Sequence, residues 1–395
     1  MSEPEAQNTL WSLPTASLVN GLVGFIFAAT GPVALVLAAL ARGGLGEPEI
    51  ASWLFGGFFL NGFLTVAFSI WYRQPLVFLW SIPGTVLVGQ ALGHMSYPEV
   101  VGAYFATGAL MLALGASGVV NRAMSAVPMP VVLAMVAGVF LQFGIDWIKA
   151  FGTAPFIAAP MTAVFLALSA FPAAARVVPP MVVTLGVGIA AAILTGSVVP
   201  GPPLQLALAG PQLIVPQFSW AAMLELVVPL AITVLVAQNA PGFAVLTQAG
   251  HTPPVDRIAS ACGVGAMVTS LVGTVSTCLA GAITGILVTG DKRETQYISG
   301  VVVGTLGIGF GLAAPMIARL SLAAPQAMIA TLAGLAMLKV LQTAFIGAFQ
   351  GRYAMSALIT FLITVSGITV LNIGAPFWGI VLGALSARVL EREGS

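Results

Sequence analysis

The chain has 395 residues, of which 59% are hydrophobic and only 6% are charged, and its 13 basic residues nearly balance its 12 acidic ones. Soluble domains carry about a quarter charged residues, so this sequence cannot cover a water-facing surface with polar groups. The balanced charge argues against nucleic acid as a partner, because binding it requires a basic face. The composition predicts an all-α integral membrane protein whose surface contacts lipid.

Apolar runs bounded by helix breakers predict about fourteen membrane segments, each judged against the roughly 20 residues that a spanning helix needs. The segments of the first half cover residues 17–40, 48–70, 76–92, 98–119, 127–147, 155–171 and 180–199. Those of the second half cover residues 220–239, 258–273, 276–288, 297–318, 326–349, 355–371 and 377–389.

A proline-rich stretch without charge, residues 201–218, divides these segments into two sets of seven. An odd number in each half gives the halves opposite orientations, which is typical of an inverted repeat. The sequence therefore predicts a first repeat over residues 1–200, an extracytoplasmic linker over 201–218 and a second repeat over 219–395.

The basic residues fall mainly in alternate loops. With a cytoplasmic N-terminus, the cytoplasmic side receives most of the arginines, and the outside receives only Arg42, Lys149 and Arg319. This bias follows the positive-inside rule. We expect a multi-pass protein of a bacterial inner (plasma) membrane with both termini in the cytoplasm.

The third and tenth segments are too short to cross the bilayer as plain helices, and they occupy matching places in the two halves. In the third, an apolar β-prone run meets Ser81, a suitable N-cap, and Pro83, which suits a first helical turn. In the tenth, hydroxyl residues again precede a small-residue helix, and we expect its N-terminus near Ser276, Thr277 and Cys278.

Two half-helices whose N-termini converge would place two positive dipole ends at one point. Such a point binds an anion such as a carboxylate without an arginine. The predicted donors are Ser81, Ile82, Pro83, Gly84, Thr85, Ser276, Thr277 and Cys278. The alternative is that these are ordinary kink and packing residues of membrane helices.

The eighth segment carries two adjacent amides, Gln238 and Asn239, just before Pro241. Amides in an apolar helix need hydrogen-bond partners, and Pro241 frees a carbonyl one turn earlier. They are expected to bond substrate, although a helix–helix hydrogen bond would also explain them.

Few other side chains offer chemistry at membrane depth. The sequence shows no metal-ligand spacing, no phosphate-binding glycine loop with a lysine, and no nucleophile with its acid and base. We therefore expect no metal, no cofactor and no enzymatic activity. The candidates for carrying a coupling proton are Glu225, His94 and the carboxyl group of the substrate itself, and interfacial and surface roles are the alternatives for the two residues.

Two motifs resemble the benzoate/proton symporter family of bacteria over nearly the whole chain. They are Trp80-Ser81-Ile82-Pro83-Gly84 and Gln238-Asn239-Ala240-Pro241-Gly242-Phe243-Ala244-Val245-Leu246, with Pro253-Pro254 following. That family is similar in turn to uracil permeases and sulfate-type anion transporters. The resemblance implies seven plus seven inverted helices, a core domain from segments 1–4 and 8–11, a gate domain from segments 5–7 and 12–14, and frequent dimers.

The chain departs from the family where Leu271-Val272-Gly273 replaces a Pro-Phe-Gly element and Cys278 replaces an asparagine. The positions at which uracil permeases have carboxylates correspond here to Gln238 and roughly to Ala282. Neither of these side chains can carry a proton.

The resulting hypothesis is a secondary transporter that imports benzoate or a similar aromatic carboxylate with a proton. Thr30 is expected to contribute its hydroxyl to the substrate site, and Phe27 and Trp80 are expected to pack on the aromatic ring of the substrate. The alternatives are a nucleobase or inorganic-anion carrier of the same fold, an ion channel, and a membrane scaffold.

Overall fold

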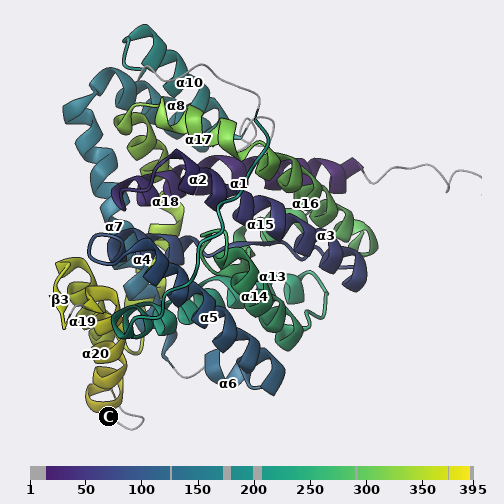
Figure 1. Cartoon of the computed structure of the whole chain (residues 1–395), viewed down its shortest axis with the longest axis vertical. Helices are drawn as coiled ribbons and strands as arrows, with labels where there is room; N and C mark the ends of the chain where they lie inside the picture. The colour runs from purple at the N-terminus through teal and green to yellow at the C-terminus, as the bar shows by residue number, and fades with distance from the viewer. Residues whose placement is uncertain are drawn as a thin grey trace, which may run out of the picture.

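The apolar runs fold into helices along most of the chain, as the computed structural model in Figure 1 shows. The structure describes residues 15–124, 127–171, 179–198, 207–289, 292–371 and 373–391. The first half contains α1 (Thr15–Arg42), α2 (Glu47–Leu54), the π-helix η1 (Phe55–Leu60), α3 (Asn61–Tyr72), β1 (Phe78–Trp80), α4 (Ile82–Ala91), α5 (Tyr97–Ser117), α6 (Val120–Met124), α7 (Met129–Thr153), α8 (Pro155–Ala170) and α10 (Pro180–Leu194).

The second half opens with one long helix made of α11 (Trp220–Ala222), the π-helix η2 (Met223–Val227), α12 (Val228–Ile232), the π-helix η3 (Thr233–Asn239) and α13 (Ala240–Gln248). It continues with α14 (Val255–Ser270), β2 (Thr277–Leu279), α15 (Gly281–Leu287), the 3₁₀ turn η4 (Arg293–Thr295), α16 (Gln296–Leu312), α17 (Ala314–Leu322), α18 (Gln326–Phe349), α19 (Ala354–Ser366), β3 (Thr369–Val370), β4 (Ile373–Gly374) and α20 (Ala375–Leu390).

Each predicted segment overlaps a helix or a strand followed by a short helix, but the eleventh, 297–318, is divided between α16 and the start of α17. Seven of the described helices are long and apolar enough to cross a membrane. The prediction that the eighth segment ends at residue 239 is wrong, because the helix continues past Pro241 to Gln248. There η3 is wound so that the Ala240 N–H bonds to the Leu235 carbonyl, which accommodates the following proline within one continuous helix.

The helices pack in two sets. In one set, α5 packs on α14, α3 packs on α16, and α1 packs on α4, α15 and α16. In the other set, α7 packs on α18 and α19, α19 packs on α20, and α8 packs on α10. The two sets touch where α1 meets α18 and where α4 meets α7 (Figure 1).

The part of the linker that the structure describes, from residue 207 onward, runs extended across one end of the bundle (Figure 1). Its N–H groups at Ala209, Ile214 and Gln217 donate to the carbonyls of Leu312, Leu271 and Pro98, respectively. These acceptors lie at the ends of α16 and α14 and at the start of α5, so the linker ties those three helices together on one side. Residues 201–206 lie outside the described residues.

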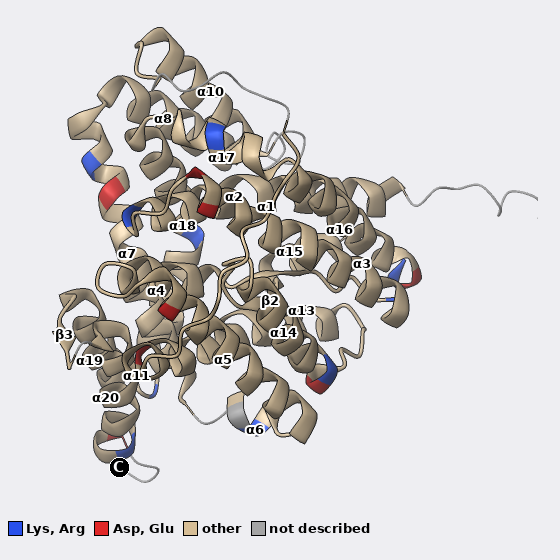
Figure 2. Cartoon of the chain, in the orientation of Figure 1, with Lys and Arg blue, Asp and Glu red and all other residues tan. Residues whose placement is uncertain are grey.

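The outer surface of the bundle is apolar. Leu194, Trp71 and Phe156 are 87%, 83% and 78% exposed, and Figure 2 shows long stretches of helix without a charged residue. Large exposed side chains of this kind are stable against lipid and unfavourable against water.

The α5–α14 contact depends on glycine. A Cβ atom at Gly263 would lie 2.7 Å from the Leu112 Cα and 2.8 Å from the Gly108 carbonyl oxygen. Small residues at such crossings allow two membrane helices to approach closely. Because the obstructing atoms are backbone, a side chain here requires the two helices to separate.

We predict that Gly263→Ala lowers the free energy of unfolding by about 1–3 kcal/mol, the usual effect of overpacking. The apparent melting temperature of the purified protein in detergent is the measurement. Gly309→Ala in α16 is the matched control, because no neighbouring atom of the residues that the structure describes lies within 4 Å of a Cβ placed there. Equal melting temperatures for the two variants would contradict the close α5–α14 contact.

Candidate functional site

The two interrupted segments meet inside the bundle and pair with each other. Strands β1 and β2 are antiparallel, with Phe78 opposite Leu279, Leu79 opposite Cys278, and Trp80 opposite Thr277. The ladder continues on both sides, because the Ser81 N–H donates to the Ser276 carbonyl over 3.0 Å and the Ala280 N–H to the Val77 carbonyl over 2.8 Å. All these residues are buried. The pairing therefore provides partners for backbone groups that lipid would leave unsatisfied.

The helix that follows β1 begins as the sequence predicts. Ser81 is the N-cap of α4, and its Oγ accepts the Gly84 N–H over 3.1 Å and donates to the Thr233 hydroxyl over 3.0 Å. The N–H and hydroxyl of Thr85 both bond to the Ser81 carbonyl. Pro83 has no N–H to donate. None of these bonds uses the Ile82 N–H, which therefore remains as a backbone donor at this helix terminus.

The prediction that the tenth segment's helix begins at Ser276–Cys278 is wrong. Thr277 and Cys278 lie in β2, because their extended backbone completes the ladder with β1, and α15 begins at Gly281. The N-cap residue is Ala280, which has no side-chain group to bond the helix terminus. Within the described part of the chain, the N–H groups of Gly281, Ala282 and Ile283 therefore have neither an intrahelical acceptor nor a side-chain cap.

The three predicted donors before α15 support the strand pair from within the protein. Thr277 Oγ1 donates to Asn61 Oδ1 over 2.9 Å. Cys278 is fully buried. Ser276 Oγ is buried without a hydrogen-bond partner among the described residues.

A small cavity of about 20 Å³ lies against the start of both half-helices. Four predicted site residues, Phe27, Trp80, Ile82 and Gln238, line it. The rest of its lining is Pro32, Leu79, Ala280, Ala282 and Ile283. A cavity of this volume holds about one water molecule, so an aromatic ring requires the walls to move.

Trp80 forms a buried wall of this cavity. It is 2% exposed, and its ring centroid lies 5.2 Å from that of Trp53 and 4.9 Å from that of Phe58 in edge-on contacts. Its Nε1 is buried without a hydrogen-bond partner among the described residues. An indole N–H normally finds an acceptor when it is buried, so this unpaired donor is an exception.

The two amides of the eighth segment have different surroundings. Asn239 is fully buried, and its Oδ1 accepts the Leu279 N–H over 2.8 Å while its Nδ2 lies 3.7 Å from the Cys262 sulfur. Gln238 is half-buried and lines the small cavity. Asn239 therefore positions β2, whereas Gln238 faces the space beside the half-helices.

Thr30 lies away from the small cavity. Its hydroxyl donates to the Ile26 carbonyl of its own helix over 2.8 Å. The residue lines a second cavity of about 410 Å³ between α1, α10, α17 and α18, whose other lining residues are almost all apolar. Two other residues of α1, Phe27 and Pro32, line the small cavity instead.

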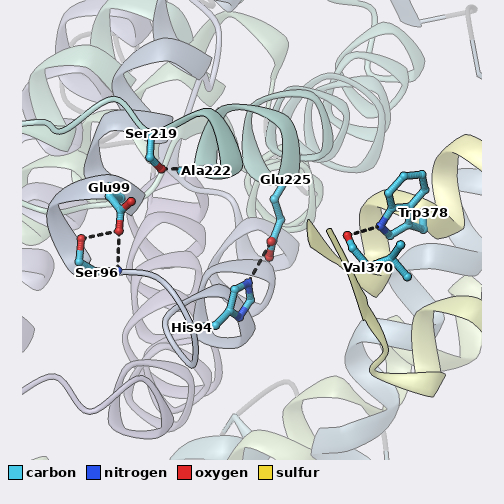
Figure 3. A network of polar contacts seen from close by, with 8 residues as sticks. All are labelled: His94, Ser96, Glu99, Ser219, Ala222, Glu225, Val370 and Trp378. Atoms are coloured by element: carbon cyan, nitrogen blue, oxygen red, sulfur yellow. Dashed lines mark hydrogen bonds and ion pairs between the residues drawn. The ribbon is translucent and has the colours of Figure 1, made fainter. Parts of the chain in front are cut away.

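The two candidates for a coupling proton form a pair, which the sequence did not predict. His94 Nε2 lies 3.0 Å from Glu225 Oε2, and the Glu225 side chain is only 6% exposed (Figure 3). His94 follows α4, and Glu225 lies in η2. Glu225 also contacts strand β4, because a Cβ atom at Gly374 would lie 2.8 Å from its Oε1.

We predict that Asn239→Ala lowers the free energy of unfolding by about 1–3 kcal/mol without any substrate present, because it leaves the buried Leu279 N–H unpaired. Gln238→Ala is the matched control and keeps the wild-type stability. Melting temperatures in detergent compare the two. If the two variants melt alike, Asn239 does not hold β2.

The chain matches known proteins over nearly its whole length. Residues 12–389 match the family model described as benzoate membrane transport protein. The chain is 29% identical over 388 residues to the inner membrane protein YdcO of Escherichia coli K12, covering 97% of each chain. It is also 29% identical over 387 residues to the benzoate membrane transport protein of Acinetobacter baylyi, covering 96% of each.

Solved structures show the same fold at low sequence identity. The transmembrane domain of a cyanobacterial bicarbonate transporter, BicA, superposes with a TM-score of 0.60 at 15% identity over 94% of this chain and 97% of that one. SLC26A9 superposes with a TM-score of 0.65 at 15% identity over 95% of this chain and 65% of that one. The chain therefore shares the inverted-repeat fold of these transmembrane domains. The chain belongs to the benzoate membrane transport protein family, BenE.

Proposed function

We propose that this protein is a secondary transporter that imports benzoate or a similar aromatic carboxylate, coupled to a proton, by alternating access. The observation that carries the proposal is the β1–β2 pair, which brings the N-termini of α4 and α15 to one small cavity. Membership of a family described as benzoate membrane transport protein supports the substrate class.

The carboxylate is assigned to the N–H groups at the start of the two half-helices. The Ile82 N–H at α4 and the uncapped N–H groups of Gly281, Ala282 and Ile283 at α15 present partial positive charge in an apolar setting. In this assignment Ser81, Pro83, Gly84 and Thr85 shape the α4 terminus. Thr277 and Cys278 of β2, with Ser276 directly before the strand, support that terminus.

Side chains around these termini suit the rest of the substrate. The Trp80 indole N–H and the Gln238 amide each offer a donor to a carboxylate oxygen. The rings of Phe27 and Trp80 supply apolar surface for an aromatic group.

Transport requires the cavity to enlarge and to open alternately to the two sides. We assign α1–α5 and α11–α16 to a core domain and α7, α8, α10 and α18–α20 to a gate domain, in line with the two packing sets. The cavity of about 410 Å³ lies between α1 of the core and α10 and α18 of the gate, where relative movement of the domains changes its size. Both termini are assigned to the cytoplasm from the distribution of arginines.

The coupling proton is assigned to the His94–Glu225 pair. Glu225 belongs to the core domain and contacts Gly374 of the gate domain. Its charge therefore lies at the boundary where the two domains move relative to each other. The pair lies several helical turns from Gln238, so we assign its effect to domain movement rather than to contact with the substrate.

Ligand-induced thermal stabilisation of the purified protein tests the substrate class. We expect benzoate and substituted benzoates to raise the melting temperature, and uracil, sulfate and bicarbonate to leave it unchanged. Stabilisation by uracil or an inorganic anion in place of benzoate would refute the aromatic substrate. Saturable uptake in proteoliposomes separates a carrier from a channel or a scaffold.

Two variants test the assigned donors in the same assay. Gln238→Ala and Trp80→Phe are each expected to raise the Kd for benzoate about tenfold or more, since a hydrogen bond to a charged group contributes about 1.5–3 kcal/mol. Trp80→Phe retains an aromatic ring and removes the N–H. Thr30→Val is the matched control, because its hydroxyl bonds its own helix. Wild-type affinity in both donor variants would contradict this site.

Glu225→Gln tests the proton assignment. We expect it to abolish benzoate accumulation driven by a pH gradient in proteoliposomes while benzoate counterflow continues. Glu99→Gln is the control, because Glu99 is another carboxylate near this end of the bundle, where it accepts the Ser96 N–H at the start of α5 (Figure 3). Unchanged gradient-driven accumulation in Glu225→Gln would exclude this carboxylate from coupling.

A further inference from the structure

Besides the His94–Glu225 pair, a cluster of charged residues lies at the end of the core domain where α3 ends and α16 begins. A cavity of about 420 Å³ is lined there by Arg73, His251, Arg293 and Glu294. These residues come from three separate loops, and none of them belongs to the transport site. Two guanidinium groups face one carboxylate, so the lining carries an excess of positive charge even with a neutral histidine.

The backbone and one neighbouring ring hold the first arginine in place. Arg73 follows the last residue of α3 with its backbone in the left-handed region, at φ 53° and ψ 37°. Residues other than glycine rarely adopt this conformation. Its guanidinium lies 4.6 Å from the ring centroid of Tyr297. The stacking fixes the group beside the cavity and leaves its N–H donors free to bind an anion.

The other two basic groups are anchored as well. Arg293 Nη1 donates to the Gly250 carbonyl over 2.9 Å. His251 is 7% exposed, and its Nε2 lies 2.7 Å from Gln296 Oε1, while Gln296 Nε2 donates to the Val288 carbonyl. With the glutamine held in this way, its Oε1 accepts a hydrogen bond from His251 Nε2.

The surface next to Arg73 faces lipid. On α3, Phe63, Ile70 and Trp71 are 53%, 51% and 83% exposed. Tryptophan is enriched where a membrane helix reaches the headgroup layer. Trp71 therefore places Arg73 and the cavity at the depth of the lipid phosphates (Figure 2 shows the basic residues at this end of α3 and α16).

We propose that this cavity binds the phosphate of an anionic phospholipid, with Arg73 and Arg293 as its main ligands. Arginine recognises phosphate oxygens through paired N–H bonds, and basic recesses between membrane helices are suited to lipid headgroups. On the orientation proposed above, the lipid comes from the cytoplasmic leaflet.

The test compares lipid binding to the full-length protein by native mass spectrometry and by thermal shift in detergent. Phosphatidylglycerol is the probe, phosphatidylcholine with the same acyl chains is the neutral control, and inorganic phosphate is the soluble anion. We expect the wild type to bind phosphatidylglycerol preferentially and to melt higher in its presence.

The double variant Arg73→Gly/Arg293→Gln should lose this preference, with at least a tenfold weaker affinity for phosphatidylglycerol. Glycine accepts the left-handed backbone, and Arg293 is exposed, so the fold is retained and an unchanged benzoate response verifies it. Arg352→Gln, which removes an arginine stacked on Tyr353 elsewhere, should behave as the wild type. Persistence of the lipid preference in the double variant overturns the proposal. So does equal stabilisation by inorganic phosphate, which would mark a site for a soluble anion.

Discussion

A backbone that leaves a helix inside a membrane must find hydrogen-bond partners within the protein, and this requirement organises the middle of the molecule. The short ladder between β1 and β2 meets it, because the two interrupted segments satisfy each other. The same ladder fixes where α4 and α15 begin and therefore where their unpaired N–H groups lie.

Side chains from flanking helices complete the outer edges of this ladder. Thr65 Oγ1 accepts the Phe78 N–H over 2.9 Å, and Asn239 Oδ1 accepts the Leu279 N–H over 2.8 Å. Each strand is thus bonded on one side by its partner strand and on the other by a polar residue of a neighbouring helix. This arrangement makes the pair a rigid base against which small donors can be held in position.

The sequence predicted the features that depend on local pattern. The apolar runs, the short third and tenth segments, and the cap at Ser81 all follow from spacing and residue type, and the structure confirms them. The start of α15 was misplaced, because Thr277 and Cys278 suit an extended strand as well as a position before a helix, and only pairing with β1 decides between the two.

Features that depend on contacts between residues far apart in the chain could not be predicted from the sequence. The π-helical turn η3 gives Gln238 and Asn239 different surroundings, and nothing in their adjacent positions distinguishes a positioning amide from one that lines a cavity. His94 and Glu225 were both singled out, but their contact joins residues 131 positions apart in the sequence and needs the folded core.

The central claim is that the carboxylate of the substrate lies between the two half-helix termini. The most direct measurement is dipolar-recoupling NMR on the protein in lipid, between benzoate labelled with ¹³C at its carboxyl carbon and backbone ¹⁵N at Ile82 and Ala282. The account predicts contacts to both nitrogens at separations of about 3–4 Å, as hydrogen bonding requires. A benzoate that binds with its carboxylate distant from both nitrogens, for instance in the cavity lined by Thr30, would contradict it.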